Sequence, residues 1–227
     1  MNLLAIETAT ENCSVALVSG SRVRSRQRLV PREHGALLLP WIRELMSEMG
    51  LAWDELDALA IGRGPGGFTS LRIGISVAQG IALPNRLPVH AVSSLAALAV
   101  AGRPAEFEGP VLACLDARMG EVYAGVFRFP SGELEALGDE TVIAPDRLEL
   151  PGDDGVWGVG SGFAAHRESL VRRLGGQLVG HDAAVWPGAR QIAELALTVE
   201  ARPAEQLQPV YLRDRVARPA QESGSSG

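Results

Sequence analysis

The sequence predicts an α/β protein of two related lobes, and three observations support this prediction. An apolar strand, an acidic residue, a turn and a second apolar strand follow one another at Leu3–Val18 and again at Val111–Phe127. A strand that leads through glycines into a helix occurs at Ala58–Leu83 and, in shorter form, from Val156 onward. The 227 residues, with 46% apolar and 21% charged side chains, suffice for two small globular lobes.

The first 50 residues are typical of three strands and a helix. Leu3–Ile6 and Cys13–Val18 are predicted to form a hairpin, and the more polar Val23–Val30 a third strand nearer an edge. Apolar residues then recur at helical spacing over Glu33–Met49, which predicts a helix with a wide apolar face. Because Pro40 lies inside this pattern, we expect a bend or a delayed start.

A glycine-rich loop then connects a strand, Leu59–Ile61, to a second helix. That helix is expected at Ser70–Leu83, with Thr69 or Ser70 as its N-cap and Pro84 at its end. The elements predicted beyond it are, in order, a strand at Leu87–Val92, a helix at Ser93–Gly102, the second strand unit, a hairpin near Ser131–Gly132, a polar run to about Asp154, a second glycine loop in Val156–Phe163, a helix at Ala164–Leu174, a helix at Gly188–Ala201 and a short ordered segment at Pro209–Arg213.

Composition limits the chemistry that is open to the chain. All 21 basic residues are arginine, which excludes lysine Schiff-base chemistry, a lysine general base and a P-loop lysine. The net charge of −6 argues against a large autonomous nucleic-acid surface, although a local arginine patch stays open. Cys13 and Cys114 lie in apolar runs and predict buried free thiols. With no signal-like N-terminus and no long apolar run, we expect a cytoplasmic protein without membrane association.

The first glycine loop is similar to a phosphate-binding loop but lacks the lysine of the Walker A motif. Backbone N–H groups of Gly64, Gly66 and Gly67 precede a helix N-terminus, an arrangement that can bind an anion. Phe68, however, stands where the Walker A motif has its lysine. A ligand site and a purely structural turn are both open, and the structural turn is favoured.

Glu7 and Asp116 end the first strand of each repeated unit. If they face one another across a cleft, they could act as an acid–base pair or bind Mg²⁺ and its water, and with Gly64, Gly66 and Gly67 they form a candidate nucleotide site. Alternatively, they cap turns or pair with Arg118. The scattered histidines include no HxxxH or HExxH pattern, so we expect no metal site, and no residue is assigned as catalytic.

Several motifs, in order along the chain, carry a resemblance to a known family. They are LLAIETAT at Leu3–Thr10, PREH at Pro31–His34, GRGPGGFTSLRIGISVAQGIAL at Gly62–Leu83, LDARMGEVY at Leu115–Tyr123 and PVYLR at Pro209–Arg213. From Met1 to about Arg218 the chain closely resembles the bacterial TsaB family, also called YeaZ. The resemblance implies the two-lobed actin-like and Hsp70-like ATPase fold of the ASKHA superfamily. We expect an N-terminal lobe at 1–105, a smaller C-terminal lobe at 106–216 whose last helix can pack back on the first, and a disordered tail at 217–227.

The resemblance also implies a function. Family members are non-catalytic partners of TsaD and act with TsaE and TsaC to make N6-threonylcarbamoyladenosine at position 37 of tRNAs that read ANN codons. TsaC makes threonylcarbamoyl-AMP, and TsaD transfers the threonylcarbamoyl group. TsaD carries an HxxxH metal pair at the place that here reads Ser93–Leu98, without histidine. We therefore expect an accessory subunit that is not an enzyme.

The cofactors and partners follow from the same resemblance. No tightly bound cofactor is expected in this chain, and ATP or ADP is expected only in the complex. The chain is expected to contact tRNA only indirectly, through the complex. The rival hypotheses are a nucleotide-dependent ATPase or phosphotransferase of the same superfamily and, last, a metal-dependent peptidase.

The family resemblance further implies that the first two helices pack with the equivalent pair of a second molecule, either TsaD or another copy of this chain. Gly74 and Ala78 are small and lie four residues apart, which favours close contact with another helix. For the first helix, packing on its own sheet and docking to a partner are both open. The candidate contact residues are Leu38, Trp41, Ile42, Leu45, Arg72, Ile75, Ala78 and Gln79.

Overall fold

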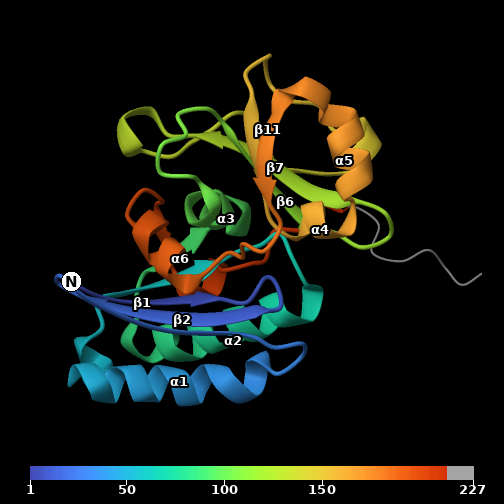
Figure 1. Ribbon diagram of the computed structural model, residues 1–227. Coiled ribbons are helices and arrows are strands. Elements are labelled where there is room, and N and C mark those ends of the chain that lie inside the picture. Colours follow the sequence, from blue (N-terminus) through green and yellow to red (C-terminus); the bar gives the residue numbers. More distant parts are fainter. Residues whose placement is uncertain (214–227) are drawn as a thin grey trace, which may run out of the picture.

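Two mixed β-sheets with two helices between them form the frame of the molecule. The computed structural model describes residues 1–213 (Figure 1), so the expected lobe end at 216 and the tail at 217–227 lie outside the described residues. The first sheet has the strand order β12-β5-β4-β1-β2-β3, and the second has the order β11-β10-β6-β7-β8, with β9 paired to β7. Figure 1 shows α1 and α2 on the outer face of the first sheet, and α3 and α6 between the sheets.

The bounds of the elements are as follows. The strands are β1 (Asn2–Glu7), β2 (Asn12–Ser19), β3 (Arg22–Leu29), β4 (Ala58–Gly62), β5 (Val89–Val92), β6 (Val111–Asp116), β7 (Val122–Arg128), β8 (Glu135–Ala136), β9 (Thr141–Ile143), β10 (Val156–Val159), β11 (Leu178–Asp182) and β12 (Ala201–Arg202). The α-helices are α1 (His34–Met49), α2 (Phe68–Asn85), α3 (Ser94–Gly102), α4 (Ser161–Ala165), α5 (Arg167–Leu174) and α6 (Ala189–Ala196). Within residues 1–213, none of the helices is both long and apolar enough to cross a bilayer.

The two halves share one topology. In the first half, β1 and β2 form an antiparallel hairpin, and β4 and then β5 add in parallel beside β1. In the second half, β6 and β7 form the hairpin, and β10 and then β11 add in parallel beside β6. Glu7 is the last residue of β1, and Asp116 is the last residue of β6. The internal repeat predicted from the sequence is therefore confirmed.

One apolar core joins the two sheets. It contains Leu3 and Ala60 of the first sheet, Leu115 and Phe127 of the second, and Leu98 of α3, each at most 3% exposed. The first six residues of α3 are all buried, which explains its continuous run of apolar residues and small serine and alanine side chains. Although α6 follows the second sheet in the chain, it packs against β1, β2, β4 and β5. The lobes are therefore packed through a common core.

Both ends of α2 differ from the predictions, whereas α1 has the predicted bounds to within one residue but not the delayed start. The N-cap of α2 is Gly67, not Thr69 or Ser70, and the Ser70 hydroxyl instead donates to the Gly67 carbonyl at 3.1 Å. Pro84 lies in the last turn and does not end the helix, which closes at Arg86 in the left-handed region with φ of 51°. The helix α1 begins at His34 and runs through Pro40, so the delayed start is wrong.

The second half contains strands that the sequence did not predict. The strand β11 mixes glycine and histidine with two apolar residues and is only partly buried, so it lacks a clear alternation. The helix expected to reach Ala201 ends at Ala196, because Ala201 pairs instead with His90 of β5. The helix expected at Ala164–Leu174 is divided into α4 and α5 at His166, whose φ of −131° is not helical.

The apolar faces of α1 and α2 are covered by the chain's own first sheet. Five of the candidate partner contacts are at most 5% exposed, namely Leu38, Ile42, Leu45, Ile75 and Ala78. Glycine is required at position 74 by packing within the same lobe, since a Cβ on Gly74 would clash with the Thr8 side chain of the β1–β2 turn. The expectation that these side chains face a second molecule is therefore wrong. Trp41 and Gln79 are half-buried and Arg72 is exposed, so a contact by these three stays a prediction.

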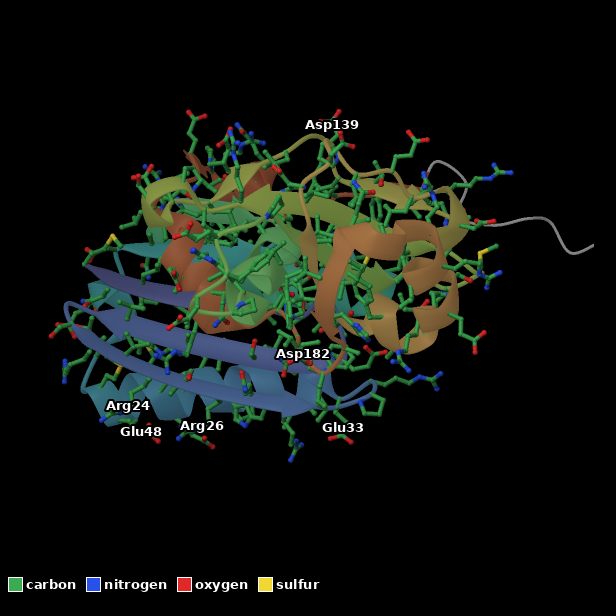
Figure 2. All side chains as sticks on the ribbon, turned by 45° about the horizontal axis from the view of Figure 1, so that its top comes forward. Arg24, Arg26, Glu33, Glu48, Asp139 and Asp182 are labelled. Atoms are coloured by element: carbon green, nitrogen blue, oxygen red, sulfur yellow. The ribbon has the colours of Figure 1, made fainter. Side chains whose placement is uncertain are left out.

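The edge strand β3 carries arginine at every second position: Arg22, Arg24, Arg26 and Arg28. Side chains alternate along a strand, so these four share one face, and we call them the arginine ladder. Arg26 pairs with Glu44 and Glu48 of α1. Figure 2 shows Arg24, Arg26 and Glu48 together at this margin of the first sheet. The ladder ties the edge of the sheet to the helix that covers it.

The burial of α1 gives a direct test of its orientation. Replacing the fully buried Leu45 by alanine should lower the free energy of unfolding by about 2–5 kcal/mol, because it leaves a cavity in the core. The matched control is Leu39→Ala on the same helix, where the side chain is 40% exposed and the loss should stay below about 1 kcal/mol. Urea unfolding of both variants measures the difference, and equal losses would contradict the assigned orientation.

Candidate functional site

A cleft of about 940 Å³ opens between the two lobes. Its wall in the first lobe is formed by Ala9–Glu11 and by Gly66–Ser70, and its wall in the second lobe by Leu115–Arg118 and Ser161. Tyr211–Arg213 also line the cleft. A cleft of this size can hold a small ligand. Three of the candidate site residues line it, namely Gly66, Gly67 and Asp116.

Glu7 lies beneath the glycine loop and not in the cleft. Its side chain is fully buried, Oε1 accepts the N–H of Ala9 at 2.5 Å, and Oε2 accepts the hydroxyl of Ser94 at 2.7 Å. A Cβ at Gly62 would clash with Oε2, so glycine at that position leaves room for the carboxylate. Because both oxygens are used within the first lobe, the expectation that Glu7 faces Asp116 across a cleft is wrong.

The environment of Glu7 also changes its protonation. Burial raises the pKa of its carboxyl above the ordinary value, while hydrogen bonds from Ala9, Ser94 and Thr8 act in the opposite direction. The folded state therefore binds the proton more tightly than the unfolded state does. The stability linked to this group is fully present below the unfolded pKa and is lost as the pH rises through the folded pKa.

The glycine loop makes close contacts with the rest of the first lobe. The N–H of Gly67 donates to the Ala9 carbonyl at 2.7 Å, and a Cβ at Gly66 would clash with the same carbonyl. The Gly64 carbonyl accepts the N–H of Ser94 at 2.9 Å. Glycine is required at these positions because neighbouring backbone approaches them closely, which agrees with the prediction of a structural turn. The bonded N–H of Gly67 is not available to a phosphate, and nucleotide binding here stays a prediction.

Asp116 is held by Arg118, as in the alternative interpretation of the sequence. Its Oδ1 accepts the backbone N–H of Arg118 at 2.9 Å, and its Oδ2 accepts Nη1 of the same residue at 3.0 Å. The other guanidinium nitrogen, Nη2, donates to Glu11 of the first lobe at 3.0 Å. Arg118 thus bridges the two walls of the cleft. Its side chain is 74% exposed, so solvent screening makes the bridge weak.

A more buried bridge involves Glu140, which lies in none of the sequence motifs. Its side chain is 13% exposed, and it pairs with Arg63 of the glycine loop at 3.3 Å and accepts the hydroxyl of Ser93. Ser93 Oγ also caps α3 by accepting the N–H of Leu95 at 3.1 Å. A serine just before an apolar helical run is the sequence signal that could have indicated this cap. The bridge joins the second lobe to the start of α3.

Metal-ligating side chains and thiols are two further kinds of group that the sequence analysis considered. Within residues 1–213, no three histidine, cysteine, aspartate or glutamate side chains gather so that they could hold a metal ion. Cys13 and Cys114 are buried free thiols, as predicted, and burial raises the pKa of each to about 12. Both therefore stay protonated at neutral pH.

The duplicated sheets, the helices between them and the cleft define a class of protein, the two-lobed actin-like and Hsp70-like α/β fold. A family model described as "TsaD: tRNA N6-adenosine threonylcarbamoyltransferase" matches residues 22–218. The chain is 39% identical over 226 residues to the tRNA threonylcarbamoyladenosine biosynthesis protein TsaB of Escherichia coli (strain K12), covering 96% of both chains. It is 36% identical over 229 residues to the TsaB of Haemophilus influenzae, covering 95% of both.

A solved structure agrees with these sequence comparisons. YeaZ from Pseudomonas aeruginosa superposes with a TM-score of 0.85 at 42% identity, covering 93% of this chain and 99% of that one. The chain belongs to the TsaB (YeaZ) family of tRNA threonylcarbamoyladenosine biosynthesis proteins.

The buried carboxyl of Glu7 predicts a pH-dependent difference in stability. In Glu7→Gln the amide keeps both contacts, because the Ser94 hydroxyl can accept as well as donate, but the ionisation is removed. The free energy of unfolding of the variant relative to the unmodified chain should rise as the pH increases from about 4.5 to 8. Urea unfolding at several pH values measures this. The exposed Glu106→Gln is the control, and a pH-independent difference for Glu7→Gln would count against the assignment.

Proposed function

We propose that this chain is a non-catalytic accessory subunit, required with TsaD and TsaE for transfer of the threonylcarbamoyl group from threonylcarbamoyl-AMP to adenosine 37 of ANN-decoding tRNAs. The names of its relatives support the pathway, and the matched family model describes the transferase itself. The chain would hold no tightly bound cofactor, and ATP or ADP would act only in the complex. The bonded N–H of Gly67 and the presence of Phe68 in place of a lysine support this part of the proposal.

The start of α3 is the observation that carries the accessory role. TsaD has its HxxxH metal pair at the place corresponding to Ser93–Leu98, and this stretch contains no histidine. Ser93 is occupied in capping the helix, and Ser94 donates to the buried Glu7. The next residues of α3 are alanine and leucine in the common core. No side chain of this stretch is available as a metal ligand, so the transfer chemistry would come from TsaD.

The outward surface of α1 and α2 is the proposed docking surface for TsaD or for a second copy of this chain. Arg72 is the one charged residue in the 18 residues of α2. Leu39 of α1 and Leu83 of α2 are 40% and 44% exposed. We define the α1–α2 face by the exposed or half-buried residues Ala36, Leu39, Pro40, Thr69, Ile73, Ser76, Val77, Gly80, Ile81 and Leu83. Exposed apolar side chains gathered on one surface are typical of a protein interface.

Reconstitution tests the proposed function. A mixture of TsaC, TsaD, TsaE, tRNA, threonine, bicarbonate and ATP should form threonylcarbamoyladenosine only when this chain is added. The reason is that the chain is proposed to hold TsaD in its competent arrangement. Nucleoside analysis of the tRNA by mass spectrometry measures the product. Undiminished modification without the chain would refute the proposal.

A charge on the α1–α2 face tests the docking surface. Ser76 is exposed, so Ser76→Arg should leave the isolated chain folded but place an unpaired charge and a large side chain in the interface. We expect at least tenfold weaker capture of TsaD by gel-filtration co-elution and titration. Val171→Arg on α5 is the matched control, since that helix residue is 41% exposed on the other lobe. Equal capture by the two variants would exclude this face.

A further inference from the structure

Two exposed aromatic rings and an arginine form a stack at the mouth of the cleft. Phe68 and Tyr211 are 45% and 44% exposed, and their ring centroids are 5.7 Å apart. The guanidinium carbon of Arg72 lies 3.8 Å from the centroid of the Phe68 ring. Arg72 Nε also donates to the Tyr211 hydroxyl at 3.0 Å. We call these three residues the aromatic–arginine stack, and its internal contacts order it before any ligand binds.

Further arginines surround the stack. Arg32, Arg118 and Arg213 line the same cleft as Phe68 and Tyr211. Arg118 is paired with carboxylates of both lobes, and Arg213 is paired with Glu121. By contrast, no ion pair found in the described part of the chain involves Arg32 or Arg72. Among residues 1–213, therefore, two guanidinium groups at the mouth of the cleft lack a carboxylate partner, in a chain whose net charge is −6.

We propose that the aromatic–arginine stack binds an unstacked base of a single-stranded RNA segment, with phosphates of that segment against Arg32 and Arg72. Proteins read single-stranded RNA by stacking bases on aromatic rings and guanidinium planes, and arginine forms charge-assisted hydrogen bonds to phosphate. The inference rests on the proposed function, since the RNA would be a loop of the substrate tRNA. It goes beyond that function by giving the accessory subunit a direct contact with the substrate.

The observations favour RNA over a protein at this place. Tyrosine, phenylalanine and arginine also occur in protein interfaces. Here, however, three planar groups are held together, and the arginines Arg32 and Arg72 have no carboxylate partner among residues 1–213. Phe68 and Arg72 belong to the first turns of α2, so the RNA would lie beside a partner docked on the α1–α2 face.

The test uses the reconstituted complex with tRNA, and its variants separate stacking from folding. Tyr211→Ala removes a ring, Tyr211→Phe keeps the ring and loses only the hydroxyl, and Arg72→Gln removes the charge. Trp53→Ala and Arg24→Gln are matched controls. Trp53 is 40% exposed in a short turn before β4, and Arg24 lies on β3, at the opposite edge of the first sheet from β12. Co-elution with TsaD confirms that each variant still assembles.

If the proposal holds, Tyr211→Ala and Arg72→Gln should raise the KM for tRNA about fivefold to tenfold, measured on variant complexes that are fully assembled. Tyr211→Phe and the controls should stay within twofold of the unmodified chain. A photoreactive phenylalanine analogue at position 211 should crosslink to the tRNA. Unchanged KM values for Tyr211→Ala and Arg72→Gln, or crosslinks to a protein partner alone, would overturn the inference. Either result can occur while modification still requires the chain, so the proposed function is judged separately by reconstitution.

Discussion

Burial of the Glu7 carboxyl group is the constraint on which the turn after β1 and the start of α3 depend. A buried carboxylate must receive hydrogen bonds, and here they come from the turn after β1 and from the start of α3. The same turn presents the Ala9 carbonyl to the N–H of Gly67, the N-cap of α2. One residue at the end of β1 therefore positions two helices and the rim of the cleft. The Glu7 carboxyl group fits at this place because residue 62 is glycine, since a Cβ there would clash with it.

The common core holds the two lobes in a fixed position relative to each other. A protein that works by opening and closing its lobes needs separately packed halves joined by a hinge. Here α3 packs against the second sheet, α6 packs against the first sheet, and the two helices contact each other within the common core. Glu140 also ties the second lobe to Arg63 and Ser93 of the first. Such a frame can hold another protein in one fixed orientation. This property agrees with the proposed accessory role, in which the chain arranges TsaD and does not itself turn over substrate.

Local sequence determined the topology but not the surroundings of individual side chains. Each repeat begins with continuous apolar runs that end at an acidic residue, so the two hairpins were predictable. Glu7 and Asp116 occupy the same place in this pattern, at the end of an apolar strand. Glu7 is nevertheless buried, because Gly62 and Ser94, both distant in the chain, make room for its carboxyl group and donate to it. Helical spacing in α1 predicted an apolar face but not which surface covers Leu45. Long-range contacts also explain β12, which exists only because it pairs with β5.

The arginine ladder has a consequence for how the molecule meets its own copies. Within residues 1–213, no strand pairs with the outer margin of β3, and an unpaired margin of this kind can start the continuous sheets of aggregates. If a second copy paired its β3 with this β3, the two arginine ladders would lie opposite each other and their like charges would be close together. Repulsion between guanidinium groups thus opposes sheet extension. This repulsion disfavours association through the strand margin, and the outward surface of α1 and α2 does not depend on that margin to meet a partner.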